Sequence, residues 1–198
     1  MTANATNLTL RDTILGASTI ARRSVTITAG AALIALFAQI SIPLSFTPVP
    51  ITGQTFAVLL VGTALGATDG TASAGVYVLA GALGAPVYAN HAHGWDVIRS
   101  PSGGYLLGFI IAATVTGSLA QQGWDRKLST SIGAMLSGNV VIYLIGIPWL
   151  AQQLGISISK ALELGLYPFV AGDILKTYLA AGALPAAWRL AQRQNARE

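Results

Sequence analysis

Four long stretches of this 198-residue chain contain no Asp, Glu, Lys or Arg. They run over residues 24–68, 70–93, 100–124 and 128–159, and each exceeds the roughly 20 apolar residues that one helix needs to cross a bilayer. Only 9% of all residues are charged, against roughly a quarter in soluble domains, and the mean hydropathy is +0.62. The pattern therefore predicts an all-α membrane protein.

We expect a single compact bundle of six transmembrane helices, at 24–42, 52–68, 71–89, 103–121, 130–150 and 164–188. The second and third helices are close enough to form a tight hairpin that turns at Asp69-Gly70. Pro43, Pro48 and Pro50 follow the first helix and predict a structured loop there, because proline lacks the backbone donor that a helix interior requires.

The bundle forms one domain over residues 1–198, with an N-terminal segment (1–23), the helices (24–188) and a tail (189–198). A cytoplasmic N-terminus would give the inner side most of the basic residues: Arg11, Arg22, Arg23, Arg126, Lys127, Arg189, Arg193 and Arg197. Because cytoplasmic loops carry an excess of Lys and Arg, both termini are predicted to be cytoplasmic. Topology thus accounts for the net charge of +4, and no nucleic-acid partner is expected.

Two ionisable residues, Asp173 and Lys176, lie inside the sixth predicted helix. Each costs roughly 2.5–3.5 kcal/mol at membrane depth on insertion scales, so their presence needs a reason. At a spacing of three they share one helix face and can partly neutralise each other. The pair either satisfies itself inside the bundle or faces a polar ligand in a cavity, and we favour the ligand.

Outer loops add further polar groups on the same side of the membrane. Asn90 offers a donor and an acceptor, Gln54 offers an amide at the start of the second helix, and Arg99 offers a forked cation suited to a carboxylate. Arg99 is equally well explained as an exposed loop cation. Together these groups predict a ligand site that opens outward, in apolar surroundings.

Other chemistries are less well supported by the sequence. His91, His93 and Asp96 could bind a metal, but no third strong ligand accompanies the two histidines, so we expect no metal. No nucleophile with a recognisable base is present, so we expect no catalytic residue and no cofactor, and an enzyme using Asp173 is the alternative of a different class. The phosphate-binding pattern G-x-x-x-x-G-K-[ST] is missing, so active transport would take its energy from another polypeptide.

Five motifs carry a resemblance to a known family: QISIPL at 39–44, PVPIT at 48–52 followed by QT, GAPVY at 84–88, PSGGYLLGF at 101–109 and PFVAGDILK at 168–176. They resemble the BioY family, the biotin-specific substrate-binding (S) subunits of energy-coupling factor (ECF) transporters. The resemblance implies a multi-pass protein of a bacterial-type plasma membrane that captures biotin from outside. It also implies a transmembrane coupling (T) protein and paired cytoplasmic ABC-type ATPases as partners.

The resemblance also assigns roles to residues. Asn90, Arg99, Asp173 and Lys176 match the family's polar contacts to biotin, whose ureido ring has two N–H donors and one carbonyl and whose tail ends in a carboxylate. Tyr88, Tyr143 and Phe46 are expected as apolar walls, and Gln54 as an amide at the entrance. Ala31 and Ala35, small residues at a spacing of four in the first helix, match the family's contact with the coupling protein. An S subunit for another vitamin or for a metal ion is the alternative within this architecture.

Overall fold

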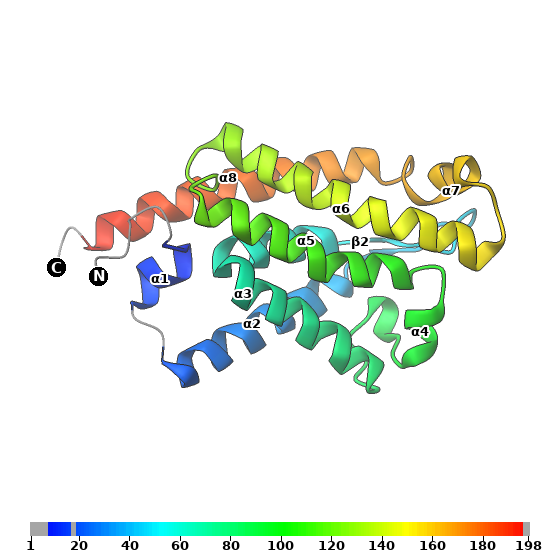
Figure 1. The fold of residues 1–198 in the computed structure, drawn as a ribbon, viewed down its shortest axis with the longest axis horizontal. Coiled ribbons are helices and arrows are strands. Elements are labelled where there is room, and N and C mark those ends of the chain that lie inside the picture. Colours follow the sequence, from blue (N-terminus) through cyan, green and yellow to red (C-terminus); the bar gives the residue numbers. More distant parts are fainter. Residues whose placement is uncertain (1–7, 17–18, 196–198) are drawn as a thin grey trace.

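The computed structural model describes residues 8–16 and 19–195, which are almost entirely helical (Figure 1). Arg197, which the sequence assigns to the inner side, lies outside these residues. The α-helices are α1 (Leu10–Leu15), α2 (Ile20–Ala38), α3 (Gln54–Ala82), α4 (Trp95–Arg99), α5 (Gly103–Gln121), α6 (Leu128–Leu154), α7 (Ile158–Gly165) and α8 (Val170–Asn195). A 3₁₀ turn, η1 (Ala89–His91), precedes α4, and two short strands, β1 (Ser41–Ile42) and β2 (Ile51–Thr52), lie between α2 and α3.

Four of the described helices, α2, α3, α5 and α6, are long and apolar enough to cross a membrane. The α8 helix is of similar length but more polar, because it carries Asp173, Lys176, Arg189 and Arg193. The chain is therefore a mostly helical protein with several potential membrane spans. The count of six crossings stays a prediction.

The predicted hairpin of the second and third helices is present, but the predicted position of its turn was wrong. The chain reverses within α3 at Gly66, whose φ of 82° and ψ of 175° are non-helical. The two arms then run side by side, since a Cβ added to Gly70 would lie 2.6 Å from the Cα of Gly62. Gly66 suits the turn because a residue without Cβ adopts positive φ readily. Asp69 and Gly70 instead form the first turn of the returning arm.

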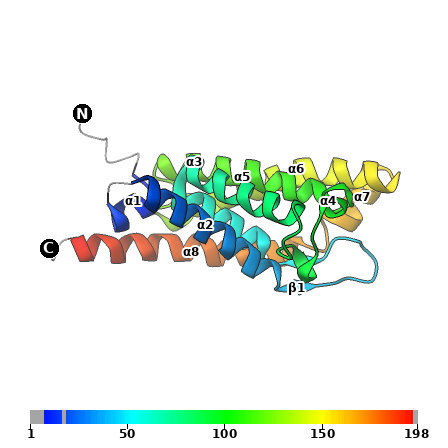
Figure 2. The ribbon, with the colours of Figure 1, turned by 90° about the horizontal axis from the view of Figure 1, so that it is seen from below.

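The predicted loop after the first helix is also present. Strands β1 and β2 pair antiparallel, with Ser41 opposite Thr52 and Ile42 opposite Ile51, and the proline-rich segment 43–50 connects them. The first helix ends at Ala38 instead of residue 42, because residues 41–42 pair with the second strand. This strand pair lies toward one end of the molecule, next to the first residues of α3 (Figure 2).

The α5 helix packs between α3 and α6, while α2 covers α3 and α8 covers α6 and part of α3 (Figure 1). The helices run roughly along the longest axis of the molecule. One end holds α1, the turn of α3, the α5–α6 connection and the C-terminal half of α8, and the other end holds the strands, α4 and α7 (Figures 1 and 2). We call these the terminal end and the loop end.

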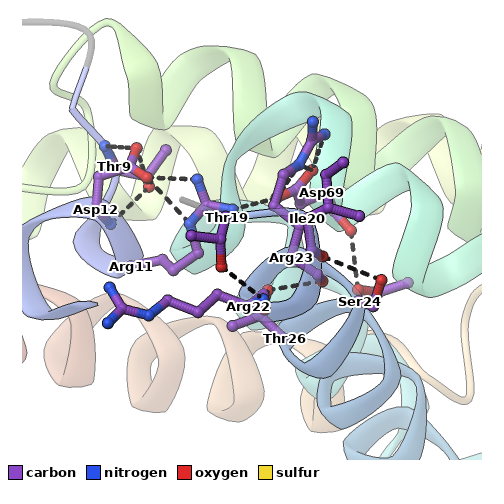
Figure 3. Close-up of polar contacts among 11 residues, drawn as sticks. Thr9, Arg11, Asp12, Thr19, Ile20, Arg22, Arg23, Ser24, Thr26 and Asp69 are labelled. Atoms are coloured by element: carbon purple, nitrogen blue, oxygen red, sulfur yellow. Dashed lines mark hydrogen bonds and ion pairs between the residues drawn. The ribbon is translucent and has the colours of Figure 1, made fainter. Parts of the chain in front are cut away.

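A cluster of charges fastens the terminal end (Figure 3). Arg11 of α1 and Arg23 of α2 both pair with Asp69, whose side chain is only 4% exposed, and the Nε of Arg23 lies 3.1 Å from its Oδ1. Leu10 packs against Trp188 and Ala191 of α8. The short α1 helix therefore ties α2, the turn of α3 and α8 together, instead of standing apart from the bundle.

Candidate ligand-binding site

A cavity of about 430 Å³ lies at the loop end of the molecule. This volume is in the ordinary range for small-molecule sites, roughly 300–1,000 Å³. Its wall is drawn from the strand pair, the start of α3, the segment before α4, and the helices α4, α5, α6 and α8. The lining residues are Val49, Pro50, Thr52, Gln54, Thr55, Tyr88, Ala89, Asn90, Ala92, Asp96, Val97, Ser100, Ser102, Tyr105, Leu106, Phe109, Ile142, Tyr143, Phe169, Asp173 and Lys176.

The predicted pair of ionisable residues lies in this wall. Asp173 and Lys176 are on one face of α8, and the Lys176 Nζ donates to Asp173 Oδ1 at 3.0 Å. The same Nζ donates to Thr55 Oγ1 at 3.0 Å, and the Tyr143 hydroxyl donates to the other carboxylate oxygen of Asp173. Because Thr55 is on α3 and Tyr143 is on α6, the network joins three helices.

This network leaves hydrogen-bonding capacity for a ligand. The Asp173 residue is 7% exposed, so its carboxylate is held in a largely apolar wall with Lys176 as its counter-charge. An ammonium group has three N–H donors and a carboxylate has about four acceptor positions, so two donors and several acceptors are in use. The remaining donor of Lys176 and the remaining acceptors of Asp173 fit a ligand that offers both N–H and C=O groups.

Tyr88 forms an aromatic part of the wall, and its position is fixed on two sides. Its hydroxyl donates to Val78 O at 2.6 Å, and its ring meets Tyr77 edge to face with centroids 5.6 Å apart. The ring lies directly over Gly81, where an added Cβ would be 2.2 Å from the Tyr88 Cζ. Glycine is therefore required at position 81 for this ring to reach the cavity.

Gln54 and Asn90 also line the cavity, but their side-chain amides differ in how far they are already hydrogen-bonded and exposed. The Gln54 amide is already engaged, since its Nε2 donates to the Tyr77 hydroxyl and its Oε1 accepts from Thr52 Oγ1 at 2.8 Å. Asn90 is exposed at the cavity mouth and has a left-handed backbone conformation, with φ of 57° and ψ of 35°. Asn90 is thus the more available of the two amides.

The structure does not bring the other two predicted binding residues to the cavity. Arg99 is the last residue of α4, and because α4 turns Ile98 into the core, the Arg99 side chain is exposed. Phe46 is 58% exposed at the tip of the 43–50 segment, where Thr47 and Val49 are buried in its place. Neither Arg99 nor Phe46 is among the residues that line the cavity.

Two residues of the cavity wall, Thr55 and Tyr105, were not predicted from the sequence. Thr55 bonds directly to Lys176, and its only sequence signal was its place beside Gln54 in a family motif. Tyr105 lines the cavity and anchors α7, since its hydroxyl donates to Gly165 O at 2.9 Å. Its ring meets Tyr143 edge to face at 6.3 Å, so Tyr105 supports a residue that contacts Asp173.

Two other sets of sequence candidates have clear locations. His91 and His93 are exposed near the cavity mouth, and the described residues contain no group of three His, Cys, Asp or Glu able to hold a metal ion. Ala31 is buried in the core and Ala35 is half-buried against it, both on the side of α2 that faces the bundle. The surface of α2 that points away from the bundle is formed by other residues: Ala21, Val25, Thr28, Ala29, Ala32 and Leu36.

Comparison with known proteins gives consistent matches across nearly the whole chain. The model of the BioY family matches residues 4–193. A biotin transporter BioY from Rhizobium etli is 37% identical over 164 residues, covering 75% of this chain and 87% of the relative. A biotin transporter BioY from Thermotoga maritima is 41% identical over 150 residues, covering 76% and 86%. The crystal structure of an S-component for biotin from an ECF-type ABC transporter is 26% identical, with a TM-score of 0.75, and covers 87% of this chain and 95% of that one.

Proposed function

Because this chain belongs to the BioY family, we propose that it is the biotin-binding subunit of an ECF-type uptake transporter. The protein is a transport subunit and not an enzyme. The observation that carries the proposal is the Asp173–Lys176 pair, which lies in the wall of a mostly apolar cavity and retains free donor and acceptor positions.

The wall matches the chemistry of biotin group by group. The Asp173 carboxylate accepts from a ureido N–H, and Lys176 donates its remaining N–H to the ureido carbonyl. The Tyr88 and Tyr143 rings pack against the fused rings of the ligand. The aliphatic tail then points to the mouth, where the exposed Asn90 amide meets its carboxylate.

Replacing Asp173 with Asn tests this assignment. We expect Asp173→Asn to weaken biotin binding by roughly 10- to 100-fold, because the buried Lys176 loses its counter-charge and a ureido N–H exchanges a charged acceptor for a neutral one, a loss of about 1–3 kcal/mol. Isothermal titration of detergent-purified protein measures the affinity. Glu163→Gln makes the same chemical change on the exposed α7 and should leave the affinity within about twofold of wild type.

Two results would contradict the proposal. One is folded wild-type protein that binds no biotin. The other is preferential binding of another vitamin or a metal ion in a competition screen, which would favour a different S subunit. Chemical turnover of a bound ligand would instead favour an enzyme that uses Asp173.

We further propose that the chain crosses the membrane six times, with both termini in the cytoplasm. The α3 hairpin would make two crossings, one that continues from β2 through residues 54–65 and one through residues 67–82, in addition to α2, α5, α6 and α8. The distribution of charge supports this orientation, because the described basic residues other than Arg99, Lys160 and Lys176 gather at the terminal end. The cavity then opens at the outer face of a cell membrane of bacterial type.

The proposed partners are the coupling (T) protein, reached through α2, and the ABC-type ATPases that the T protein would carry. Ala31 is buried against the bundle, so docking would use the exposed side of the helix, which borders the half-buried Ala35. Ala21, Ala29 and Ala32 are exposed small residues there. Small residues let helices approach closely in lipid, where tight packing drives association. Membrane lipid would cover the rest of the apolar surface.

A further inference from the structure

Gln39 connects the end of α2 to the segment that forms the cavity mouth. It is the residue that caps the C-terminus of α2, and its side-chain Nε2 donates to Ala35 O at 3.1 Å in its own helix. The same Nε2 lies 3.1 Å from Tyr88 O and 3.3 Å from Val87 O. Its Oε1 accepts from the backbone N–H of His91 at 3.2 Å. The two N–H groups of Nε2 are shared among these three carbonyls, so one side chain contacts three backbone groups of the segment 87–91.

The segment that Gln39 holds is strained. Asn90 and His91 have φ values of 57° and 59°, and they are the two residues other than glycine with positive φ in the part of the chain that the structure describes. Such left-handed conformations cost about 1–3 kcal/mol each and persist only where surrounding contacts enforce them. Within the segment, Ala92 N donates to Ala89 O and Tyr88 N donates to Ala92 O. Gln39 supplies hydrogen bonds that reach the backbone of this segment from outside the loop.

We propose that Gln39 is a positioning residue for biotin binding, whose amide holds the segment 87–91 in the conformation that places Tyr88 and Asn90 at the cavity. This inference rests on the proposed function. Gln39 does not line the cavity, so it acts only through the residues that it holds. When the binding-competent conformation is populated only in part, the apparent affinity falls by that fraction. Loss of the clamp should therefore weaken binding although every contacting side chain is still present.

The sharpest variant is Gln39→Glu. It keeps an oxygen to accept from the His91 N–H, but it removes the donors to Val87 and Tyr88 and places a carboxylate oxygen beside their carbonyl oxygens. The chain offers a matched control in Gln122→Glu. Gln122 caps α5 as Gln39 caps α2, and its Nε2 likewise donates to the carbonyl four residues earlier, Ser118 O, at 3.2 Å. Gln122 lies in the α5–α6 connection at the terminal end, far from the cavity mouth (Figure 1).

The first measurement is amide hydrogen exchange of the full-length protein without ligand. We expect the peptide over residues 86–94 to exchange at least severalfold faster in Gln39→Glu and in Gln39→Ala than in wild type. Gln122→Glu should leave that peptide unchanged. Unchanged exchange of residues 86–94 in both Gln39 variants would overturn the positioning role whatever the ligand of the cavity is.

The second measurement is biotin affinity in a double-mutant cycle. Gln39→Glu should weaken binding about tenfold, as expected for the loss of two hydrogen bonds of ordinary strength. In an Asn90→Ala chain the further loss of affinity caused by Gln39→Glu should shrink to threefold or less, because the Asn90 contact is gone and Tyr88 keeps its own contacts with Val78 and Tyr77. Thr55→Val alters the side of the cavity next to α8. In that chain, the loss of biotin affinity caused by Gln39→Glu should stay near tenfold.

The two measurements separate this inference from the proposed function. The positioning role would be overturned if folded Gln39→Glu bound biotin with wild-type affinity. It would also be overturned if Gln39→Glu weakened binding equally in the Asn90→Ala and Thr55→Val chains. In both cases biotin binding by the wild-type protein would stand. Failure of the wild-type protein to bind biotin would overturn the proposed function, and the exchange experiment would still decide whether Gln39 orders the segment.

Discussion

Asp125, in the connection between α5 and α6, is a carboxylate with no exposed surface. One of its oxygens accepts from the Trp188 indole of α8, and the other has no hydrogen-bond partner among the described residues. The Arg126 guanidinium lies 4.8 Å from the centroid of the Trp188 ring. Burial raises the pKa of Asp125 above its usual value, because desolvation disfavours the charged form, although the bond from Trp188 opposes this.

This raised pKa predicts a dependence of stability on pH. The folded protein holds the Asp125 proton to a higher pH than the unfolded chain does, so its contribution to stability is present below the ordinary pKa of about 4 and is lost as pH rises through the raised pKa. Asp125→Asn cannot ionise. The difference in unfolding temperature between Asp125→Asn and wild type should therefore shift in favour of the variant as pH rises from 4 to 8.

Thermal unfolding in detergent at a series of pH values measures this difference. Glu163→Gln, which removes an exposed carboxylate, is measured in the same series as a surface control. A difference between Asp125→Asn and wild type that is constant across the series would mean that folding does not raise the pKa of Asp125.

Individual residues of the site differed in how well the sequence predicted them. Asp173 and Lys176 were predictable because charge at membrane depth is rare and a spacing of three fixes their common face. Arg99 was not, because its direction depends on the rotation of α4, which is set by the burial of Ile98 and not by any local pattern. Thr55 was missed because a threonine at a helix start is ordinary until a lysine from a distant helix reaches it.

At the scale of elements, α2 is the least buried of the four described helices that are long and apolar enough to cross a membrane. Only 17% of its most apolar stretch is buried, against at least 50% in α3, α5 and α6. It packs on α3 with one face, where Gly30 comes close to Ser73 and Val61. Its other face is left for lipid or for a partner, in agreement with the docking proposed above.

Enlarging one residue on that outer face tests the docking. Ala32→Trp should reduce the amount of coupling protein that co-purifies with this chain by at least tenfold, because a large side chain prevents close helix approach. Biotin binding by the variant alone should be unchanged, since α2 residues before Gln39 do not contact the cavity. The measurement is co-purification after co-expression with the coupling protein and ATPases.

Leu144→Trp is the control for that experiment. Leu144 is an exposed residue of α6, so the variant adds a similar bulk to a different apolar surface. Wild-type recovery of the complex with Ala32→Trp would exclude this face of α2 as the docking surface. A loss with both variants would point to a general effect on membrane insertion.

The hairpin of α3 shows why an element can be predicted while its turn is misplaced. The Asp69-Gly70 pair is common in turns, and for that reason the sequence predicted the reversal of the chain there. In the structure Asp69 forms ion pairs with Arg11 and Arg23, which lie 58 and 46 residues away along the chain. Gly70 is required for a different reason, its contact with the backbone of Gly62. Both causes are long-range and leave no local pattern.

At the scale of the whole molecule, the two ends have different characters. The terminal end gathers the charge cluster around Asp69 and most of the arginines, and the loop end holds the cavity. The sequence predicted this division well, because it depends on the distribution of charge along the chain, which needs no knowledge of packing. The shape of the cavity depends on how the helices pack, so it could not be predicted from the sequence.

The absence of native cysteine allows the orientation to be tested with single cysteines. In intact cells, Glu163→Cys on α7 should react with a membrane-impermeant maleimide. Lys127→Cys, in the α5–α6 connection, should react only after the membrane is permeabilised. Both side chains are exposed, so access from each side of the membrane decides the outcome. The reverse pattern would place the cavity on the cytoplasmic side.

The order in which the wall of the cavity occurs along the chain has a consequence for biosynthesis. A ribosome that has made the first 150 residues has made most of the wall, from Val49 to Tyr143. It has not yet made Asp173 or Lys176, which arrive with the last helix. A chain that stops before α8 therefore lacks the charged pair of the wall. We expect ligand capture to wait until α8 has been made and has packed against α3 and α6.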